Sequence, residues 1–202
     1  MIEAILFDLD GVLVDACDWH YEALNSALIS SDYNSISRVD HIEKFNGLPT
    51  KVKLSMLGIP DSESKKINDL KQKFTIDIIT NKASLMQEKI EMHQYLKSKN
   101  IKIGCVTNSI RETTEHMLKS TGQFEYMDII ITNEDVKKNK PYPDCYNLAI
   151  RKLEIDPQNV MCVEDSEKGI QAATTSLAGH LFVVNDTHEV NILSIKKELE
   201  NN

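Results

Sequence analysis

Five short apolar runs, rich in Ile and Val, are spaced along the chain. Most of them show little alternation between polar and apolar positions, which is typical of strands buried on both faces of a parallel sheet. The pattern therefore predicts strands at about residues 3–7, 101–106, 128–131, 160–163 and 181–184.

Segments with the period of an α-helix separate these runs in the C-terminal part of the chain. Two apolar helical faces are formed by Ile110, Thr113, Met117 and Leu118 and by Tyr146, Ala149, Ile150 and Leu153. Strands that alternate with amphipathic helices are typical of a doubly wound α/β domain with a parallel sheet. We therefore predict this fold class for the domain that contains the apolar runs.

The pattern changes between the first and second runs, where no strong strand signal occurs. Trp19, Ala23 and Ala27 repeat with helical spacing, and residues 38–45, 51–57 and 61–80 also have helical patterns. Gly and Pro interrupt them at Asn46–Pro49 and Gly58–Pro60, which predicts loops there. We expect residues 16–83 to form an all-helical domain inserted into an α/β core of residues 1–15 and 84–202.

Composition and charge exclude some classes of function. The chain has 202 residues, of which 41% are hydrophobic and 27% are charged, as is ordinary for a globular protein. Its net charge of -8 argues against nucleic acid as a main partner, because binding to a phosphate backbone needs a basic face. A small phosphorylated ligand stays compatible with this charge, because it meets only the local field.

The spacing of the cysteines and the length of the apolar segments indicate the cellular compartment of the protein. The four cysteines, Cys17, Cys105, Cys145 and Cys162, are widely spaced and include no Cys-x-x-Cys pair, so zinc and dithiol sites are not expected. The N-terminus enters a predicted strand directly, without the pattern of a signal peptide. No apolar stretch is long enough to span a bilayer. We expect a cytoplasmic protein.

Acidic residues close the first apolar run. Asp8 follows Ile5, Leu6 and Phe7 directly, and Asp10 and Gly11 come next. Two carboxylates so close together are unfavourable unless a cation or a shared proton relieves their repulsion. The end of a strand is where open α/β sheets place ligand chemistry. The simpler interpretation is a turn, since Asp and Gly are common turn residues.

Three later segments strengthen the functional interpretation. They are Thr107-Asn108-Ser109 after the second run, Lys140-Pro141-Tyr142-Pro143-Asp144, and Glu164-Asp165-Ser166 with Gly169 after the fourth run. In this order, and together with Asp8-x-Asp10, the segments resemble the four motifs of the haloacid dehalogenase superfamily. The resemblance runs from Ile2 to about Val184 and is to the helical-cap branch that includes β-phosphoglucomutase and small-metabolite phosphatases.

The resemblance implies a role for each acid. Asp8 would be the nucleophile that forms an aspartyl-phosphate. Mg²⁺ would be held by Asp8, the main-chain carbonyl of Asp10 and Asp165, with Glu164 as a further ligand or acting through water. Asp10 would act as general acid and then as general base, which favours phosphoryl transfer over carbon–halogen cleavage. The alternative for Glu164 and Asp165 is an acidic helix start before Ser166.

The resemblance also places polar and basic residues around the phosphoryl group. Thr107 would assist catalysis and Asn108 would bind substrate, at the N-terminus of a helix. Asn108 or Ser109 could equally be a plain N-cap. Lys140 would neutralise Asp8 and the transferred group, because the prolines after it stiffen the chain. Lysine clusters are more usually solvated surfaces.

The helical insertion resembles the cap of this branch. His20 and Lys51, and also Lys53, are candidates for substrate contacts from the cap. A half-buried helical histidine explains His20 equally well, and an exposed surface explains the two lysines better. The phosphate-binding arginine of the mutase cap falls on Thr50 here, which lowers the case for a mutase.

Three functions follow from these observations. The first is a Mg²⁺-dependent phosphatase of a small phosphorylated metabolite, with a sugar phosphate as the best candidate. The second is a phosphosugar mutase, which shares all the core residues and differs in the acceptor. The third is a catalytically inactive domain that binds a phosphometabolite or a protein partner. We expect a monomer or a weak dimer without nucleic acid or membrane partners.

Overall fold

The computed structural model describes residues 1–45 and 48–202. The chain forms two compact units, one of residues 1–15 and 84–202 and one of residues 16–83. The first unit contains the sheet, and the second is helical. No helix among the described residues is both long and apolar enough to cross a membrane.

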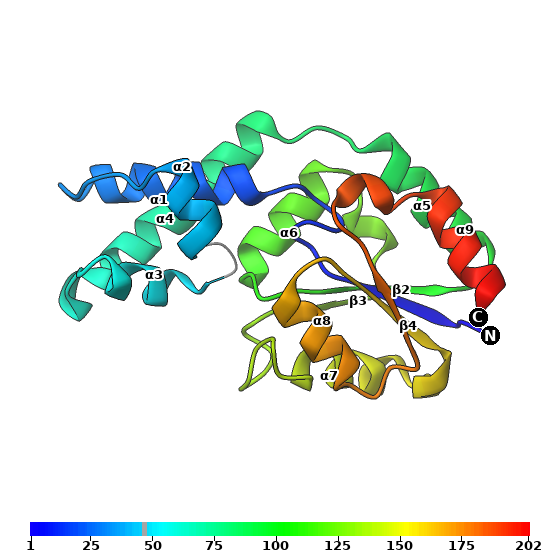
Figure 1. Ribbon diagram of the computed structural model, residues 1–202. Helices are drawn as coiled ribbons and strands as arrows, with labels where there is room; N and C mark the ends of the chain where they lie inside the picture. Colours follow the sequence, from blue (N-terminus) through cyan, green and yellow to red (C-terminus); the bar gives the residue numbers. More distant parts are fainter. Residues whose placement is uncertain (46–47) are drawn as a thin grey trace. The chain divides into compact units, whose positions relative to one another are not determined.

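The first unit is built on a parallel sheet of five strands in the order β3-β2-β1-β4-β5 (Figure 1). The strands are β1 (Ala4–Phe7), β2 (Lys102–Val106), β3 (Ile129–Ile131), β4 (Val160–Glu164) and β5 (His180–Val183). The predicted α/β fold class is confirmed, and each predicted strand agrees with the structure to within one residue at either end. These strands could be predicted from apolar runs without polar alternation, because β1, β2 and β4 are buried on both faces almost throughout.

Helices cover both faces of this sheet (Figure 1). They are α5 (Gln87–Ser98), α6 (Arg111–Ser120), α7 (Asp144–Leu153), α8 (Glu167–Thr174) and α9 (Ile192–Asn201). Helices α7 and α8 pack against one another and against one face, while α5 packs against β2 and α9 near the other face. Short 3₁₀ turns lie at Phe124–Tyr126, Pro157–Asn159 and Thr187–Glu189.

The core between the sheet and α7 and α8 determines how α7 is oriented. Side chains alternate along a strand, so Ala4 and Leu6 of β1 point to the same face. Both belong to one buried cluster with Tyr146 and Ala149 of α7 and Ala172 of α8. Burial of these apolar groups stabilises the fold by roughly 25 cal/mol for each Å² removed from water. This packing places Tyr146 directly beneath the strands.

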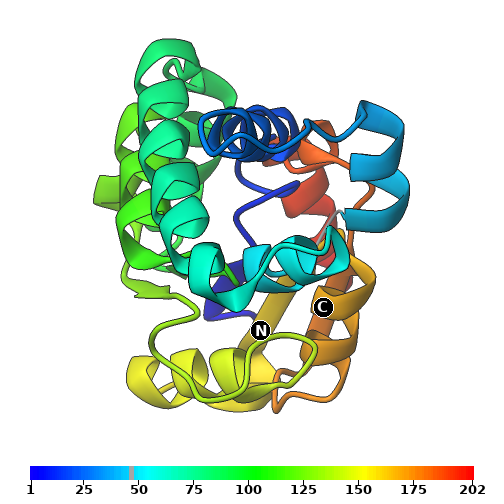
Figure 2. The same ribbon diagram turned by 90° about the vertical axis from the view of Figure 1, so that its left-hand side faces the viewer.

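The second unit contains only helices among its described residues. They are α1 (Cys17–Ile29), α2 (Arg38–Asp40), a π-helical turn η1 (His41–Phe45), α3 (Thr50–Met56) and α4 (Asp61–Lys82), seen from two directions in Figures 1 and 2. Helix α4 packs against α1 and α3, around a core that includes Leu24, Leu28, Leu54 and Ile67. The loop predicted at residues 46–49 lies partly outside the described residues, because Asn46 and Gly47 are not described.

Candidate active site

The candidate active site lies at the carboxyl end of the sheet in the first unit. Asp8 directly follows β1, Thr107 directly follows β2, and Glu164 ends β4. The strands are parallel, so these ends meet at one edge of the sheet. Main-chain hydrogen bonds fix the positions: the Asp8 N–H donates to the Val163 carbonyl at 3.0 Å, and the Thr107 N–H donates to the Ile131 carbonyl at 2.9 Å.

Lys140 supplies the buried positive charge of the site. Its side chain is only 4% exposed, and its ammonium donates to Asp8 Oδ1 at 2.8 Å and to the Val106 carbonyl at 2.7 Å. It also donates to Glu164 Oε1. These three acceptors match the three N–H donors of an ammonium group. Lys140 is therefore held in one place, in contact with the predicted nucleophile.

The side chain of Asn108 holds the main chain of Lys140. Asn108 Oδ1 accepts from the Lys140 N–H at 3.0 Å, and Asn108 Nδ2 donates to the Lys140 carbonyl at 3.1 Å. Both polar atoms of the Asn108 side chain therefore bond to the main chain of Lys140, and substrate binding by Asn108 stays a prediction. Two hydrogen bonds of this kind fix the loop that carries Lys140 relative to the end of β2.

Three carboxylates gather next to this lysine. One oxygen from each of Asp8, Glu164 and Asp165 lies within 4.8 Å of the others. Glu164 is fully buried, and Asp165 Oδ1 is a buried oxygen without a hydrogen-bond partner among the described residues. Three carboxylates and one ammonium leave excess negative charge in a buried site, which is costly unless a cation neutralises it. An all-oxygen donor set with an unsatisfied carboxylate fits a hard divalent cation such as Mg²⁺.

Two glycines allow the carboxylates to approach so closely. A Cβ at Gly11, where φ is +90°, would lie 2.0 Å from Asp165 Oδ2, and a Cβ at Gly169 would lie 1.9 Å from Glu164 Oε2. Neither distance is sterically allowed, and the positive φ of Gly11 also disfavours any other residue. The glycines of the first and fourth motifs thus make room for the acids of the fourth.

Burial and charge shift the pKa values of these groups. Burial raises the pKa of Asp8 well above its usual value, the carboxylates of Glu164 and Asp10 add to this, and Lys140 opposes it. Burial lowers the pKa of Lys140, but Asp8 and Glu164 outweigh burial and raise it overall. Burial and the charge of Glu164 raise the pKa of Asp165 to about 6. A bound cation would relieve the two carboxyl groups of this cost.

Asp10 and Thr107 lie at the rim of this cluster. The Ser109 hydroxyl donates to Asp10 Oδ2 at 2.9 Å, and Thr107 Oγ1 accepts from the Ser109 N–H at 3.0 Å. Asp10 is partly exposed, so it can exchange protons more readily than the buried acids. The sequence suggested Ser109 only as a helix cap, although a hydroxyl two residues after Thr107 was an available signal for a place in the site.

Of the two motifs that could be plain helix starts, the one at Asn108 and Ser109 is not a helix cap, whereas the one at Ser166 is. Helix α6 begins at Arg111 with Ile110 as its N-cap, so neither Asn108 nor Ser109 caps it. The first N–H of α6 donates to a Glu134 carboxylate oxygen at 2.6 Å instead. Ser166 does cap α8, by accepting from the Gly169 N–H at 3.1 Å. Glu164 and Asp165 therefore precede the start of α8 and also belong to the carboxylate cluster with Asp8.

The predicted cap residues lie in the helical unit. Lys51 is exposed, whereas Lys53 is buried and His20 is half-buried, with its Nδ1 3.2 Å from Lys71 Nζ. Burial, followed by the charges of Lys53 and His20, lowers the pKa of the buried His41 to about 4. Burial is the largest of these causes, and the charge of Asp18 opposes the shift. Lys71 and His41 were not singled out in the sequence, because helical period alone does not separate buried basic residues from exposed ones.

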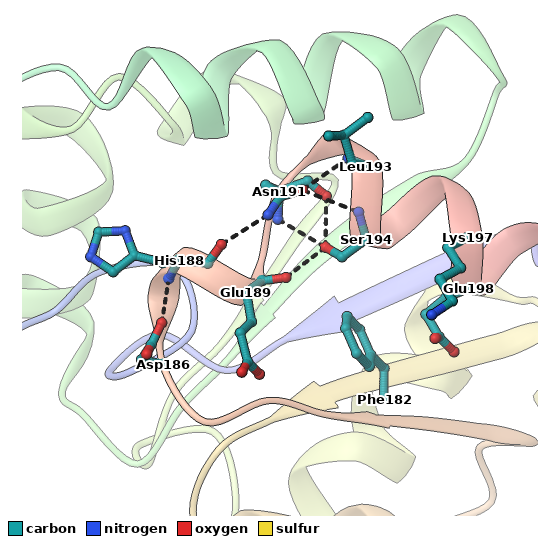
Figure 3. A pocket seen from close by; sticks show the side chains of 9 residues that line it. All are labelled: Phe182, Asp186, His188, Glu189, Asn191, Leu193, Ser194, Lys197 and Glu198. Atoms are coloured by element: carbon teal, nitrogen blue, oxygen red, sulfur yellow. Dashed lines mark hydrogen bonds between the residues drawn. The ribbon is translucent and has the colours of Figure 1, made fainter.

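A separate hollow of about 540 Å³ lies beside β5 and the start of α9. Figure 3 shows its lining, in which polar groups bond mainly to one another: Asn191 Oδ1 accepts from the N–H groups of Leu193 and Ser194, and Asp186 accepts from the His188 N–H. None of the predicted site residues lines it. The chemistry expected from the motifs therefore belongs to the carboxyl edge of β1, β2 and β4.

The geometry of this edge agrees with the comparison to protein families. The model of the family described as haloacid dehalogenase-like hydrolase matches residues 5–181, and the chain belongs to this family. Among curated relatives, the phosphorylated carbohydrates phosphatase of Thermotoga maritima is 26% identical over 197 residues, which cover 94% of this chain and 88% of the relative. The pyrophosphatase PpaX of Bacillus pumilus is 29% identical over 189 residues, which cover 88% and 82%.

Solved structures share the fold. The β-phosphoglucomutase of Clostridium difficile superposes with a TM-score of 0.82 at 23% identity, over 100% of this chain and 98% of that one. At this level of identity the likeness establishes the fold, including a helical unit after the first strand. It does not distinguish a mutase from a phosphatase.

Proposed function

We propose that this protein is a Mg²⁺-dependent phosphatase that hydrolyses a small phosphorylated metabolite through an aspartyl-phosphate at Asp8. The observation that carries the proposal is the contact of Asp8 with the buried Lys140, beside the acidic pair Glu164 and Asp165. A carboxylate can attack phosphorus only where the repulsion between two anions is neutralised. The sheet edge supplies one fixed cation and the ligands for a second.

The acids divide between metal binding and positioning. Asp8, Asp165 and the main-chain carbonyl of Asp10 would hold Mg²⁺, and the unsatisfied Asp165 Oδ1 supports this assignment. Glu164 acts through Lys140 or through water, because Lys140 and Tyr146 already donate to its Oε1. Bound Mg²⁺ would neutralise charge between the nucleophile and the phosphoryl group.

The protein side chains then carry out two successive transfers. Asp8 attacks phosphorus while Asp10 protonates the leaving oxygen. In the second transfer, Asp10 takes a proton from a water molecule, which attacks the aspartyl-phosphate and releases inorganic phosphate. The Thr107 hydroxyl and the main-chain N–H groups after β2 bind the phosphoryl oxygens, and Lys140 stabilises the charge that develops.

Substrate size and class are proposed from the relatives and from the helical unit. The curated relatives are named as phosphatases of phosphorylated carbohydrates and of pyrophosphate, so a sugar phosphate is the first candidate. Residues 16–83 would act as the cap. His20, Lys53 and Lys51 are its candidates for contact with an anionic substrate. We expect a monomer or weak dimer in the reducing cytoplasm, which agrees with four cysteines that form no disulfide.

A phosphosugar mutase is the second candidate, and the basic residues of the helical unit, among them His20 and Lys71, favour it. The uncharged Thr50 at the position of the mutase arginine favours hydrolysis. A mutase would need a bisphosphate primer and would form a sugar-phosphate isomer without net release of phosphate. The intact set of Asp8, Asp10, Lys140 and Asp165 argues against a domain that only binds.

The test is phosphate release from a panel of sugar phosphates, nucleotides, phosphoglycolate and pyrophosphate. Wild type should release phosphate with Mg²⁺, lose this activity in EDTA and recover it when Mg²⁺ is added back. Asp8→Asn should be inactive by a factor on the order of 10⁴ or more while its circular dichroism spectrum is unchanged. Full activity in EDTA, or near-normal rates in Asp8→Asn, would overturn the proposal.

A further inference from the structure

Tyr146 is a fully buried residue of α7 whose hydroxyl reaches the active site from below the sheet. The hydroxyl donates to Glu164 Oε1 at 2.6 Å. The ring centroid lies 4.9 Å from Lys140 Nζ, which is within the range of a cation–π contact. A single side chain therefore contacts both members of the Lys140–Glu164 ion pair. A buried tyrosine hydroxyl needs a polar partner, and here that partner is an acid of the fourth motif.

Glu164 depends on this contact because it has no access to water. Its Oε1 accepts from both Lys140 and Tyr146, while Oε2 faces the Ser166 hydroxyl at 3.3 Å. Gly169 closes the space beside Oε2. With the Glu164 side chain fully buried, water cannot replace a lost hydrogen bond without rearrangement. The Tyr146 hydroxyl therefore supports this carboxylate together with Lys140 and Ser166.

We propose that Tyr146 is a positioning residue of the phosphoryl-transfer site, which acts through Glu164 to keep Lys140 on the nucleophile Asp8. The proposal rests on the function proposed above. By sharing Glu164 Oε1, the hydroxyl fixes the carboxylate and takes up part of its negative charge. More of the positive field of Lys140 is then directed at Asp8 and the phosphoryl group. The fixed carboxylate also stays on the Lys140 side of the acidic cluster and leaves Asp165 to the cation.

Removal of the hydroxyl should therefore affect both the cation and the chemistry. In Tyr146→Phe the ring and its apolar packing stay, but Glu164 Oε1 has Lys140 as its only remaining donor. The carboxylate then draws Lys140 away from Asp8 and no longer holds the water molecule through which it would support the cation. Loss of such a partner to a ligand shell commonly weakens metal binding or activity by about 10- to 100-fold.

The experiment compares Mg²⁺ binding and steady-state kinetics of wild type and Tyr146→Phe. Calorimetric titration of the protein with Mg²⁺, without substrate, should give a dissociation constant about tenfold or more weaker in the variant. With saturating Mg²⁺, kcat should fall about tenfold or more while KM changes little. Tyr126→Phe is the matched control, since it removes a hydroxyl that accepts from Gln94 Nε2 at 3.1 Å outside the site. It should leave binding and kcat unchanged.

A double-mutant cycle with Glu164→Gln tests the route through Glu164. If Tyr146 acts through this carboxylate, Tyr146→Phe should change kcat less than twofold in the Glu164→Gln background. If Tyr146→Phe instead lowers kcat by the same factor in wild type and in Glu164→Gln, its role is merely structural and the proposal is overturned. Wild-type Mg²⁺ affinity and kcat in Tyr146→Phe would also overturn it, while leaving the proposed function intact. No Mg²⁺ binding by wild type would instead overturn the proposed function and this inference together.

Discussion

Two buried basic groups, one in each unit of the protein, have pKa values that are shifted in opposite directions. In the α/β unit, Lys140 contacts two carboxylates, and these outweigh burial and raise its pKa. In the helical unit, His41 is buried near the positive charges of Lys53 and His20, and its pKa is lowered to about 4. The comparison teaches that the neighbours of a buried base decide its charge. Two carboxylates keep Lys140 protonated, whereas burial and basic neighbours keep His41 neutral.

The largest effect should come from removal of the buried cation of the α/β unit. Lys140→Met keeps most of the side-chain volume but leaves Asp8 and Glu164 as buried carboxylates that face each other. Removal of one partner of a buried ion pair commonly lowers the free energy of unfolding by about 3–5 kcal/mol. Urea denaturation should show a loss of this size. Lys138→Met, which removes an exposed lysine of the same loop, is the control and should change stability by less than about 0.5 kcal/mol.

Mg²⁺ should partly reverse this destabilisation, because a divalent cation neutralises the same carboxylates. A stability of Lys140→Met equal to wild type would contradict the account of the sheet edge, since it would mean that Asp8 and Glu164 do not need the ammonium. The matched variant Glu164→Gln removes one of the two carboxylates. In this background, Lys140→Met should reduce the free energy of unfolding by less than it does in wild type.

A smaller effect is expected from a buried histidine of the α/β unit. His93 Nε2 lies 3.0 Å from Gln123 Oε1, while His93 Nδ1 is buried without a partner among the described residues. Burial lowers the pKa of His93 to about 4, from 6.5. The unfolded chain therefore binds the proton more tightly, so this contribution to stability is present above pH 6.5 and is lost as the pH falls towards 4.

Wild type should lose about 2 kcal/mol of unfolding free energy between pH 7 and pH 5 from this group. His93→Gln, which can keep a bond to Gln123, should have a shallower dependence by about that amount. Urea denaturation at the two pH values measures the difference. If the free energy of unfolding depends on pH equally in both proteins, His93 is not held neutral in the folded state.

The smallest effect should be in the helical unit. Lys53→Met removes one of the charges that disfavour protonation of His41, so the pKa of His41 should rise from about 4 towards its usual value. Burial, the larger cause, stays and should keep the pKa below 6.5. Nuclear magnetic resonance titration of the histidine ring protons measures this shift. Lys51→Met is the control, because Lys51 is exposed, and should leave His41 unchanged.

The sequence predicted the backbone well where burial alone determines the pattern. The runs that end at Phe7, Val106 and Val163 became central strands, so their polar successors met at one edge, as parallel strands require. The motifs placed Asp8, Lys140, Glu164 and Asp165 on the chain, and the fold brings them together. The positions of Asp8, Glu164 and Asp165 follow from strand ends and chain order, whereas Lys140 was identified only through the resemblance to the family motif.

Side-chain partnerships could not be predicted in the same way. The helical period identified Tyr146 only as a core-facing residue, since its hydroxyl bond to Glu164 depends on how α7 packs against the sheet. The sequence also gave no sign that the Asn108 side chain bonds to the main chain of Lys140, which lies 32 residues further along the chain. Such contacts depend on tertiary packing, and a single sequence carries no signal of packing at that distance.

The most direct test of the account is chemical capture of the proposed intermediate on Asp8. Wild type is mixed with Mg²⁺ and a substrate found in the panel, quenched within milliseconds and reduced with borohydride, which converts an aspartyl-phosphate to homoserine. Peptide mass spectrometry should find homoserine at position 8 in wild type and not in Asp8→Asn. Turnover without any modification at Asp8, or with the phosphoryl group on another residue, would contradict the assignment of the nucleophile.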